Sequence, residues 1–365
     1  MKILKKSFLL ATAALLALSL TGCPNPDSNG EGNSTELPSS GLKIEKVEKG
    51  SSIEKTFTVD LSENPLNEKG TNIFAVNKDV SSSVYVSFFE QATSEVTELK
   101  WTATVTAVSE TSLSIKVSVK LPEKDGKAIF DINISPTYTE NDTSIDQYVY
   151  FDVGNVIEES QTAFTDTLTA ITDLSQITEE ETLYFYRKGS PYNNYRYDYY
   201  YTISKDSITK QGYTYSLSSN KYTLISKYID TYTFKDGIIY DEDEEVVGTL
   251  NKTGDTYYIV SESLPRTSGS GLFATFGKEV EENGNTEESY ISFYKDGICK
   301  LQSTYTYNGE TESDEMTVVY HNDNGLISIS QMSNAIYDGN SIIILESGIL
   351  TKVDALPVVE DTSTN

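Results

Sequence analysis

The chain has 365 residues, with 55 acidic residues against 28 Lys and Arg, so its formal net charge at pH 7 is −27. Such a chain repels nucleic acid and anionic lipid headgroups, and a nucleic-acid partner is not expected. The length fits two or three domains, each able to bury its own core. Only two cysteines and one histidine are present, which is too few for a zinc site, and no cofactor or metal is predicted.

The beginning of the chain, residues 1–22, has the pattern of a signal peptide. Three lysines precede the apolar run Phe8–Leu20, which is too short to span a bilayer comfortably, and small residues follow it. The segment Leu20-Thr21-Gly22-Cys23 resembles the lipobox of bacterial lipoproteins. This resemblance implies lipidation of the Cys23 thiol, removal of the leader, and a mature protein anchored to a membrane outside the cytoplasm. Pro24 after the cysteine resembles the sorting pattern for the outer membrane, or for the cell surface.

The next two segments differ sharply in composition. Residues 23–42 are rich in Pro, Asn, Ser and Gly, which predicts a flexible tether. Residues 43–155 contain short runs of alternating apolar and polar residues, such as Phe57–Leu61 and Leu113–Val119, as antiparallel strands do. About seven such strands predict a β-sandwich. The segment resembles a bacterial immunoglobulin-like domain, with Trp101 as the candidate core tryptophan but without the cysteine pair.

A change of period marks residues 156–180. Phe164, Leu168, Ile171 and Leu174 recur at intervals of four, three and three residues, which predicts a short helical connector. A membrane-surface helix is the less favoured alternative, because no lysine or arginine lies beside the apolar stripe.

Residues 181–353 return to strands and turns, and they predict an antiparallel up-and-down meander. Aromatic-Lys-Asp-Gly and Asn-Gly sequences supply the turns. The last part, about 265–353, resembles small lipocalin-like β-barrels of bacterial lipoproteins. Phe273 stands where tryptophan is usual in the opening strand, and Ile349–Thr351 would close the barrel. Residues 354–365 are expected to form a disordered tail. The fold class is therefore mainly β, an immunoglobulin-like sandwich followed by a meander or a lipocalin-like barrel.

No set of catalytic residues stands out. His321 is the only histidine and lies in a turn-like sequence, so a Ser-His-Asp triad is disfavoured. Cys299 lies in an expected strand and fits a buried, unreactive thiol. The acidic run Asp241–Glu245 could attract calcium, but it lacks the spacing of a calcium loop and fits a solvated hairpin loop.

A run of tyrosines gives the candidate ligand site. Alternate residues of a strand point to the same face, and four tyrosines alternate here: Tyr195, Tyr197, Tyr199 and Tyr201. Packing against neighbouring strands is the favoured interpretation, and an aromatic platform for a sugar, peptide or aromatic ligand is the alternative. Two tyrosines off that face, Tyr192 and Tyr200, are expected to be more exposed.

Together these features predict a lipid-anchored, extracytoplasmic binding or interaction protein rather than an enzyme. Its partners would be the membrane, through the lipid, and a protein, a glycan or a small apolar ligand. One alternative is a structural or assembly lipoprotein that docks onto a membrane partner. A less favoured one is a hydrolase with a carboxylate pair, which a sequence cannot single out because the separation of such a pair is spatial.

Overall fold

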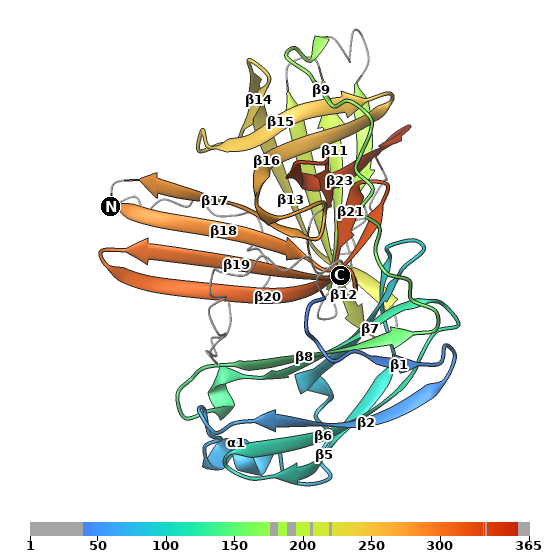
Figure 1. The fold of residues 1–365 in the computed structure, drawn as a ribbon, viewed down its shortest axis with the longest axis vertical. Coiled ribbons are helices and arrows are strands. Elements are labelled where there is room, and N and C mark those ends of the chain that lie inside the picture. Colours follow the sequence, from blue (N-terminus) through green and yellow to red (C-terminus); the bar gives the residue numbers. More distant parts are fainter. Residues whose placement is uncertain are drawn as a thin grey trace, which may run out of the picture. The chain divides into compact units, whose positions relative to one another are not determined.

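The structure of the chain is a computed structural model (Figure 1), and it describes residues 39–175, 182–187, 195–204, 207–218, 221–282, 284–330, 332 and 334–356. The protein is mainly β, as predicted, and it divides into two compact units between Glu158 and Glu159. The described part contains α1 (Glu68–Ile73) and short 3₁₀ turns at Ser81–Ser83 and Pro136–Tyr138, and Ser175 is also helical. None of the described helices is long and apolar enough to cross a membrane.

The first unit consists of two small sheets. The first sheet has five strands in the order β1 (Glu45–Val47), β8 (Ile145–Val153), β7 (Gly126–Ile134), β3 (Val84–Glu90) and β4 (Val96–Glu98). The second has three strands in the order β2 (Ser52–Asp60), β6 (Ser112–Lys120) and β5 (Trp101–Val108). All neighbours are antiparallel except β1 and β8, which run parallel.

One apolar core lies between these two sheets. Alternate residues of the strands meet there, and the rings of Phe57, Phe130 and Phe151 pack with centroids 5.0–6.5 Å apart. Burial of each such side chain contributes about 1.5–3 kcal/mol, so this core holds the sandwich together. Trp101 is only partly buried, because it begins β5 at the edge of its sheet, and its ring meets Tyr85 edge-on at 5.9 Å.

In its described residues the second unit is one long antiparallel meander of fifteen strands, as the turn sequences predicted. Its strands are β9 (Thr169–Ala170), β10 (Leu183–Arg187), β11 (Tyr195–Ile203), β12 (Ile208–Ser218), β13 (Lys221–Lys235), β14 (Ile238–Tyr240), β15 (Val246–Thr253), β16 (Thr256–Gly269), β17 (Ala274–Glu282), β18 (Asn285–Phe293), β19 (Ile298–Tyr307), β20 (Glu310–Asp323), β21 (Leu326–Ile329), β22 (Ala335–Tyr337) and β23 (Ser341–Val353). The Asn308-Gly309 turn joins β19 to β20 with φ angles of 51° and 83°. Asn and Gly adopt such positive angles readily, which explains this hairpin.

Eight of these strands, β10 to β16 and β23, close into a ring. Strand β14 links β13 to β15, and β23 pairs with both β10 and β16. Leu183, Phe185, Ile259 and Leu350 are among the buried side chains of the core that fills the ring. The barrel was predicted at about 265–353, and strand pairing closes a second ring there, because β16 pairs with both β17 and β23 and the strands β17 to β23 pair in sequence. The two rings share β16 and β23, and we keep the name ring for β10 to β16 with β23. The turn sequences specify pairing between neighbouring strands and carry no signal for the distant partner that closes the ring.

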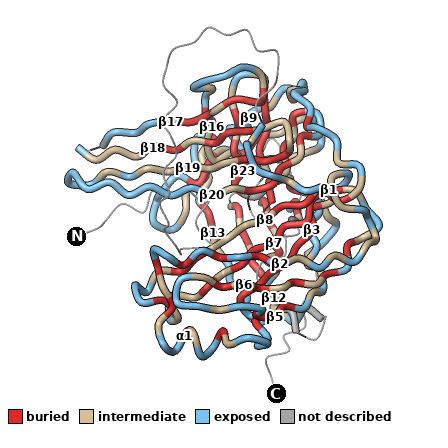
Figure 2. The backbone as a smooth tube through the Cα atoms, turned by 60° about the horizontal axis from the view of Figure 1, so that its bottom comes forward, coloured by how far each residue is buried: buried red, intermediate tan, exposed pale blue. Residues whose placement is uncertain are grey.

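Strands β17 to β20 form a projection of the second unit. Their inner ends cover a core that includes Phe276, Phe293, Cys299 and Tyr320. Their outer ends, residues 277–290 and 302–316, extend beyond this core (Figure 1), and we call them the wing. Figure 2 shows that the tips of these strands are largely exposed.

The helical connector predicted for 156–180 is wrong for residues 156–173, which contain no helix. The chain runs extended, and its amides bond to strands: Phe164 N donates to Tyr337 O and Ile171 N donates to Leu250 O, both at 2.8 Å. The apolar residues are spaced like a helical stripe, but they pack in two different clusters, Phe164 with Leu168 and Ile171 with Leu174. Ile171 lies in the core of the ring, whereas Phe164 packs in a separate cluster. Residues 176–181 lie outside the described part.

Candidate functional site

The four tyrosines of β11 lie on one face, as predicted, and their exposure is graded along the strand. Tyr195 is 40% exposed, Tyr197 and Tyr199 are half-buried, and Tyr201 is fully buried in the core of the ring. The row therefore runs from the surface into the interior of the ring. Its inner end fits the packing interpretation, and its outer end leaves aromatic rings accessible.

A buried ion pair lies at the inner end of this row. Lys210 of β12 stands directly opposite Tyr201, and its Nζ donates to Glu346 Oε1 of β23 at 3.1 Å. The same Nζ lies 5.0 Å from the centroid of the Tyr199 ring, within range of a cation–π contact. Burial lowers the pKa of Lys210, but the nearby oxygens of Tyr201 and Glu346 outweigh burial and raise the pKa above its usual value. Lys210 is therefore a fixed cation among tyrosines.

Small residues opposite the tyrosines leave room on this face. Ser216, Thr214 and Gly212 of β12 stand opposite Tyr195, Tyr197 and Tyr199, in that order. A Cβ atom on Gly212 would lie only 2.2 Å from carbons of the Tyr228 ring, so glycine at this position allows that ring to cover the strand. Tyr228 itself is 40% exposed and adds a further accessible ring.

The opposite face of β11 is packed by a second group of aromatic rings. Asp198 is buried and accepts a hydrogen bond from Arg196 Nη2 at 3.0 Å. Tyr200 lies between the rings of Tyr186 and Tyr213, with centroids 4.9 and 5.3 Å away. Burial is the main cause that raises the pKa of Tyr200 to about 12. The expectation that Tyr200 is exposed is not met, because these neighbours cover it, and Tyr192 lies outside the described residues.

His321 lies in strand β20 rather than in the predicted turn. Its Nδ1 is 3.0 Å from Glu159 Oε2, and the same carboxylate oxygen accepts the Asn322 amide at 2.8 Å. The hydrogen bond to Glu159 raises the pKa of His321 above its usual value. These contacts fasten the extended segment that begins at Glu159 onto β20, which is a structural role.

The other sequence candidates also serve the fold. Asp241 Oδ1 accepts hydrogen bonds from the amides of Asp243 and Glu245 at 3.0 and 2.8 Å, so its carboxylate shapes the turn of the acidic run. Cys299 is completely buried, and burial raises its pKa. Cys23 lies outside the described residues. Within the described ranges, no group of three or more His, Cys, Asp or Glu side chains is placed to hold a metal ion.

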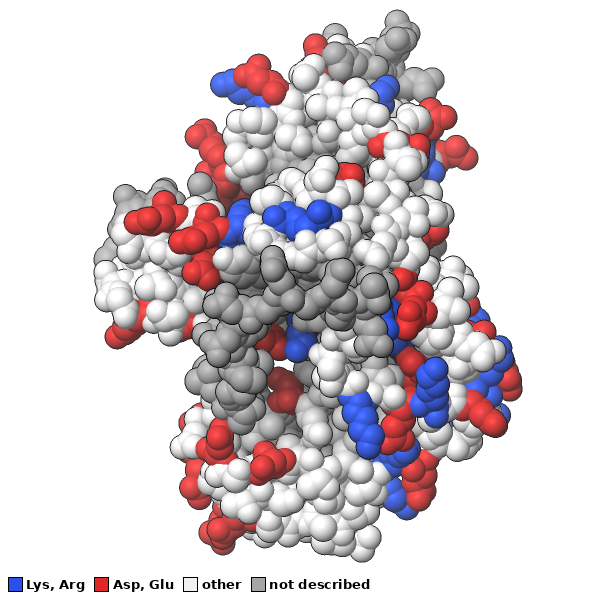
Figure 3. Space-filling model, viewed as in Figure 1, with Lys and Arg blue, Asp and Glu red and all other residues white. Residues whose placement is uncertain are grey.

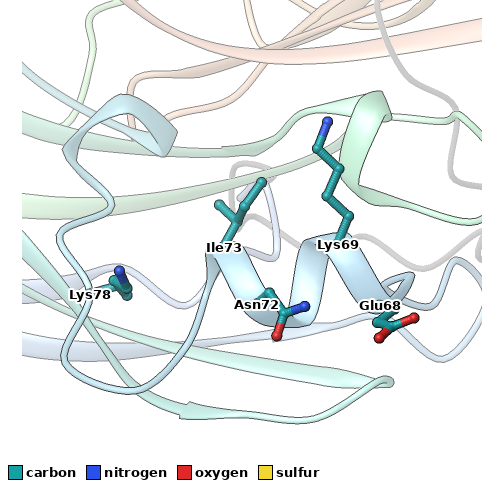
Figure 4. Close-up of a pocket in the computed structure, with 5 residues that line it drawn as sticks. All are labelled: Glu68, Lys69, Asn72, Ile73 and Lys78. Atoms are coloured by element: carbon teal, nitrogen blue, oxygen red, sulfur yellow. The ribbon is translucent and has the colours of Figure 1, made fainter.

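An open depression lies beside α1 in the first unit (Figure 4). It is lined by Glu68, Lys69, Asn72, Ile73 and Lys78. Figure 4 shows Lys69 and Ile73 on one side of the helix and Glu68 and Asn72 on the other. These side chains diverge, so the depression offers no converging polar groups for catalysis or for oriented binding.

Sequence reasoning missed three members of the tyrosine site: Lys210, Tyr228 and Glu346. A signal for Glu346 was present, because it follows the apolar run Ile342–Leu345 within one strand. A carboxylate in such a strand needs a buried partner. The sequence gives no sign that this partner is Lys210, because the two residues are 136 positions apart.

No protein-family model matches the chain, and no curated protein matches it. Among solved structures it is similar to "Structure of surface layer protein SbsC, domains 4-9", at 14% identity and a TM-score of 0.14. That match covers 76% of this chain and 30% of the other, so the chain spans less than a third of the surface layer structure. At so low a TM-score the likeness supports no conclusion about fold or function.

Proposed function

We propose that the chain is a lipid-anchored, extracytoplasmic binding protein whose ligand contacts the tyrosine row of β11. One observation carries this proposal: exposure along the row falls from 40% at Tyr195 to zero at Tyr201. A row used only for packing would be buried throughout, and an isolated surface platform would not continue into a core. The graded row offers accessible rings on a rigid base, and a rigid base favours specific recognition.

The chemistry of the site favours a ligand with flat apolar faces and polar edges, such as a glycan or a peptide. Tyrosine rings supply apolar area, and their hydroxyl groups donate and accept hydrogen bonds. Tyr195 and Tyr197 stand opposite Ser216 and Thr214, so no large side chain on β12 crowds them. Among the described residues, Tyr228 of β13 contributes the further exposed ring on this side.

The anchoring part of the proposal comes from the beginning of the chain. The lipobox resemblance at Cys23 implies a lipid, and residues 24–42 would be the tether between the membrane and the folded units. In this proposal the first unit, whose two-sheet sandwich supports the immunoglobulin-like interpretation, follows the tether in the sequence and precedes the ring. The outer membrane or the cell surface is the proposed location.

The binding site is tested with the double variant Tyr195→Ser/Tyr197→Ser, screened with the parent protein against glycan and peptide arrays. Tyr240→Ser, a partly buried tyrosine on the ring strand β14, is the matched control. We expect the double variant to bind a ligand of the parent at least about tenfold more weakly than the parent does, and the control to bind it with nearly the parent's affinity. If the parent binds nothing on either array, or if both variants lose affinity equally, the tyrosine row is not a binding site.

A further inference from the structure

The wing carries two aromatic rings that are about half exposed. Tyr305 and Tyr307 of β19 are 42% and 49% exposed, and their rings stack with centroids 6.4 Å apart at an interplanar angle of 8°. They lie two residues apart, so they share a face of the sheet. Val280, whose cross-strand partner Glu287 stands opposite Tyr305, belongs to the same face and is 43% exposed.

This face continues the apolar core from which the wing projects. Leu301 and Met316, which pack against that core, share the face with Tyr305. Farther out the apolar residues give way to the two tyrosines, so an aromatic surface extends beyond the place where the core ends. An exposed apolar surface that polar residues surround is typical of an interaction site.

Carboxylates surround these rings. Glu287 and Glu312 stand opposite Tyr305 in the two neighbouring strands, and Glu310 stands opposite Tyr307. The wing contains five glutamates in 279–290 and four acidic residues in 302–315, and its one cationic residue, Lys278, forms an ion pair with Glu262. Figure 3 shows red carboxylate residues along the outer part of this projection.

Protection of strand edges explains only part of this composition. Within the described part of the chain, β17 beyond Phe276 pairs only with β18, and β20 before Tyr320 pairs only with β19, so both outer strands have open edges there. Charged residues on such edges discourage pairing with other chains. That argument accounts for Glu310 and Glu312 on β20. It does not account for two exposed tyrosines on the inner strand β19.

We propose that this wing face docks a basic segment of a partner protein, with lysine or arginine side chains over Tyr305 and Tyr307. A cation above a tyrosine ring is attracted by the ring's quadrupole, and arginine also stacks on it. Glu287, Glu310 and Glu312 are placed on the same face to pair with the remaining positive charges. Charge complementarity selects this occupant, because an unpaired acidic surface repels an acidic one. This interface is separate from the tyrosine row of β11, and neither depends on the other.

The test uses a short fluorescent peptide of alternating lysine and glycine, with an alternating glutamate and glycine peptide as the reference. Fluorescence anisotropy measures binding to the full chain and to three double variants. Tyr305→Ser/Tyr307→Ser removes the rings and keeps the charge, whereas Glu310→Gln/Glu312→Gln removes two carboxylates from the same face. Glu279→Gln/Glu288→Gln removes the same charge from the opposite face of the wing, where these two residues pair directly.

We expect the first two variants to weaken binding of the lysine peptide by about tenfold each, and the third by less than about twofold. Added salt should weaken binding by the parent. Equal losses in both charge variants would mean that the lysine peptide responds only to the overall charge of −27, and would overturn the proposal. Absence of binding by the parent, or unchanged binding after loss of the rings, would also overturn it. The proposal fails as well if Tyr305→Ser/Tyr307→Ser loses glycan binding or self-association but still binds the lysine peptide.

Discussion

Replacing Tyr201 by alanine should destabilise the second unit far more than replacing Tyr195. Tyr201 is completely buried, stands between Phe185 of β10 and Lys210 of β12, and lies in the core of the ring. Truncation of a large buried aromatic costs about 3–5 kcal/mol, because its transfer energy is lost and a cavity remains. Tyr195 is 40% exposed, and its truncation should change stability by no more than about 0.5 kcal/mol.

The two units can be followed separately in the same denaturant titration. The chain has a single tryptophan, Trp101, and it lies in the first unit, so tryptophan fluorescence reports the unfolding of that unit. Tyrosine absorbance and far-ultraviolet circular dichroism report both units. For Tyr201→Ala we expect an unchanged tryptophan transition and a second transition at clearly lower denaturant. A domain with a total stability of about 5–15 kcal/mol would then lose a large share of it.

Equal effects of the two alanine variants would refute this reasoning. If Tyr195→Ala destabilised as strongly as Tyr201→Ala, the outer end of the row would be packed and the binding proposal would lose its support. If neither variant moved the second transition, Tyr201 would not be part of the core of the ring. Tyr197→Ala and Tyr199→Ala, both half-buried, should fall between the two extremes.

Three further predictions concern single interactions. Lys210→Met should lower the free energy of unfolding in urea by about 3–5 kcal/mol, because Glu346 is left buried without its cation. The double variant Lys210→Met/Glu346→Leu should recover much of that loss, and failure to recover it would contradict the pairing. The pKa of His321 is raised above 6.5 by Glu159, so its stabilising contribution is complete below that pH and is lost as the pH rises through the folded-state pKa. Melting temperatures of the parent should therefore fall more steeply above neutral pH than those of His321→Gln, and parallel curves would refute the contact. Cys23→Ser should abolish incorporation of labelled palmitate, and persistent labelling would rule out the lipobox.

Local features of the fold were accessible from the sequence because they depend on neighbouring residues. Alternating apolar residues such as Leu113, Ile115 and Val117 specify strands with one buried face, and all three are buried in the core of the sandwich. Asn308-Gly309 specifies a hairpin because both residues tolerate positive φ. The shared face of the β11 tyrosines was predicted from the same alternation, because every second side chain of a strand points to the same face.

Features set by distant contacts were not accessible. No sequence pattern near Lys210 indicates that it pairs with Glu346. No pattern in β23 indicates that this strand pairs with β10 and β16. The spacing of Phe164, Leu168, Ile171 and Leu174 suggested a helix, but a period of three to four also suits an extended chain whose side chains enter separate sites. Tertiary contacts, which one sequence does not display, decided between these two conformations.

Closure of the ring by β23 dictates an order of folding. Strands β10 and β16 both need residues 341–353 as a partner, so neither is fully paired until that segment has been synthesised. Pairing across so many residues is slow, because the entropy of loop closure is lost before the contacts form. A chain released before residue 341 would expose unpaired edges on β10, β16 and β22, and such edges can associate with those of other chains. Completion of this one strand therefore decides whether these strand edges are paired within the chain or stay open to other chains.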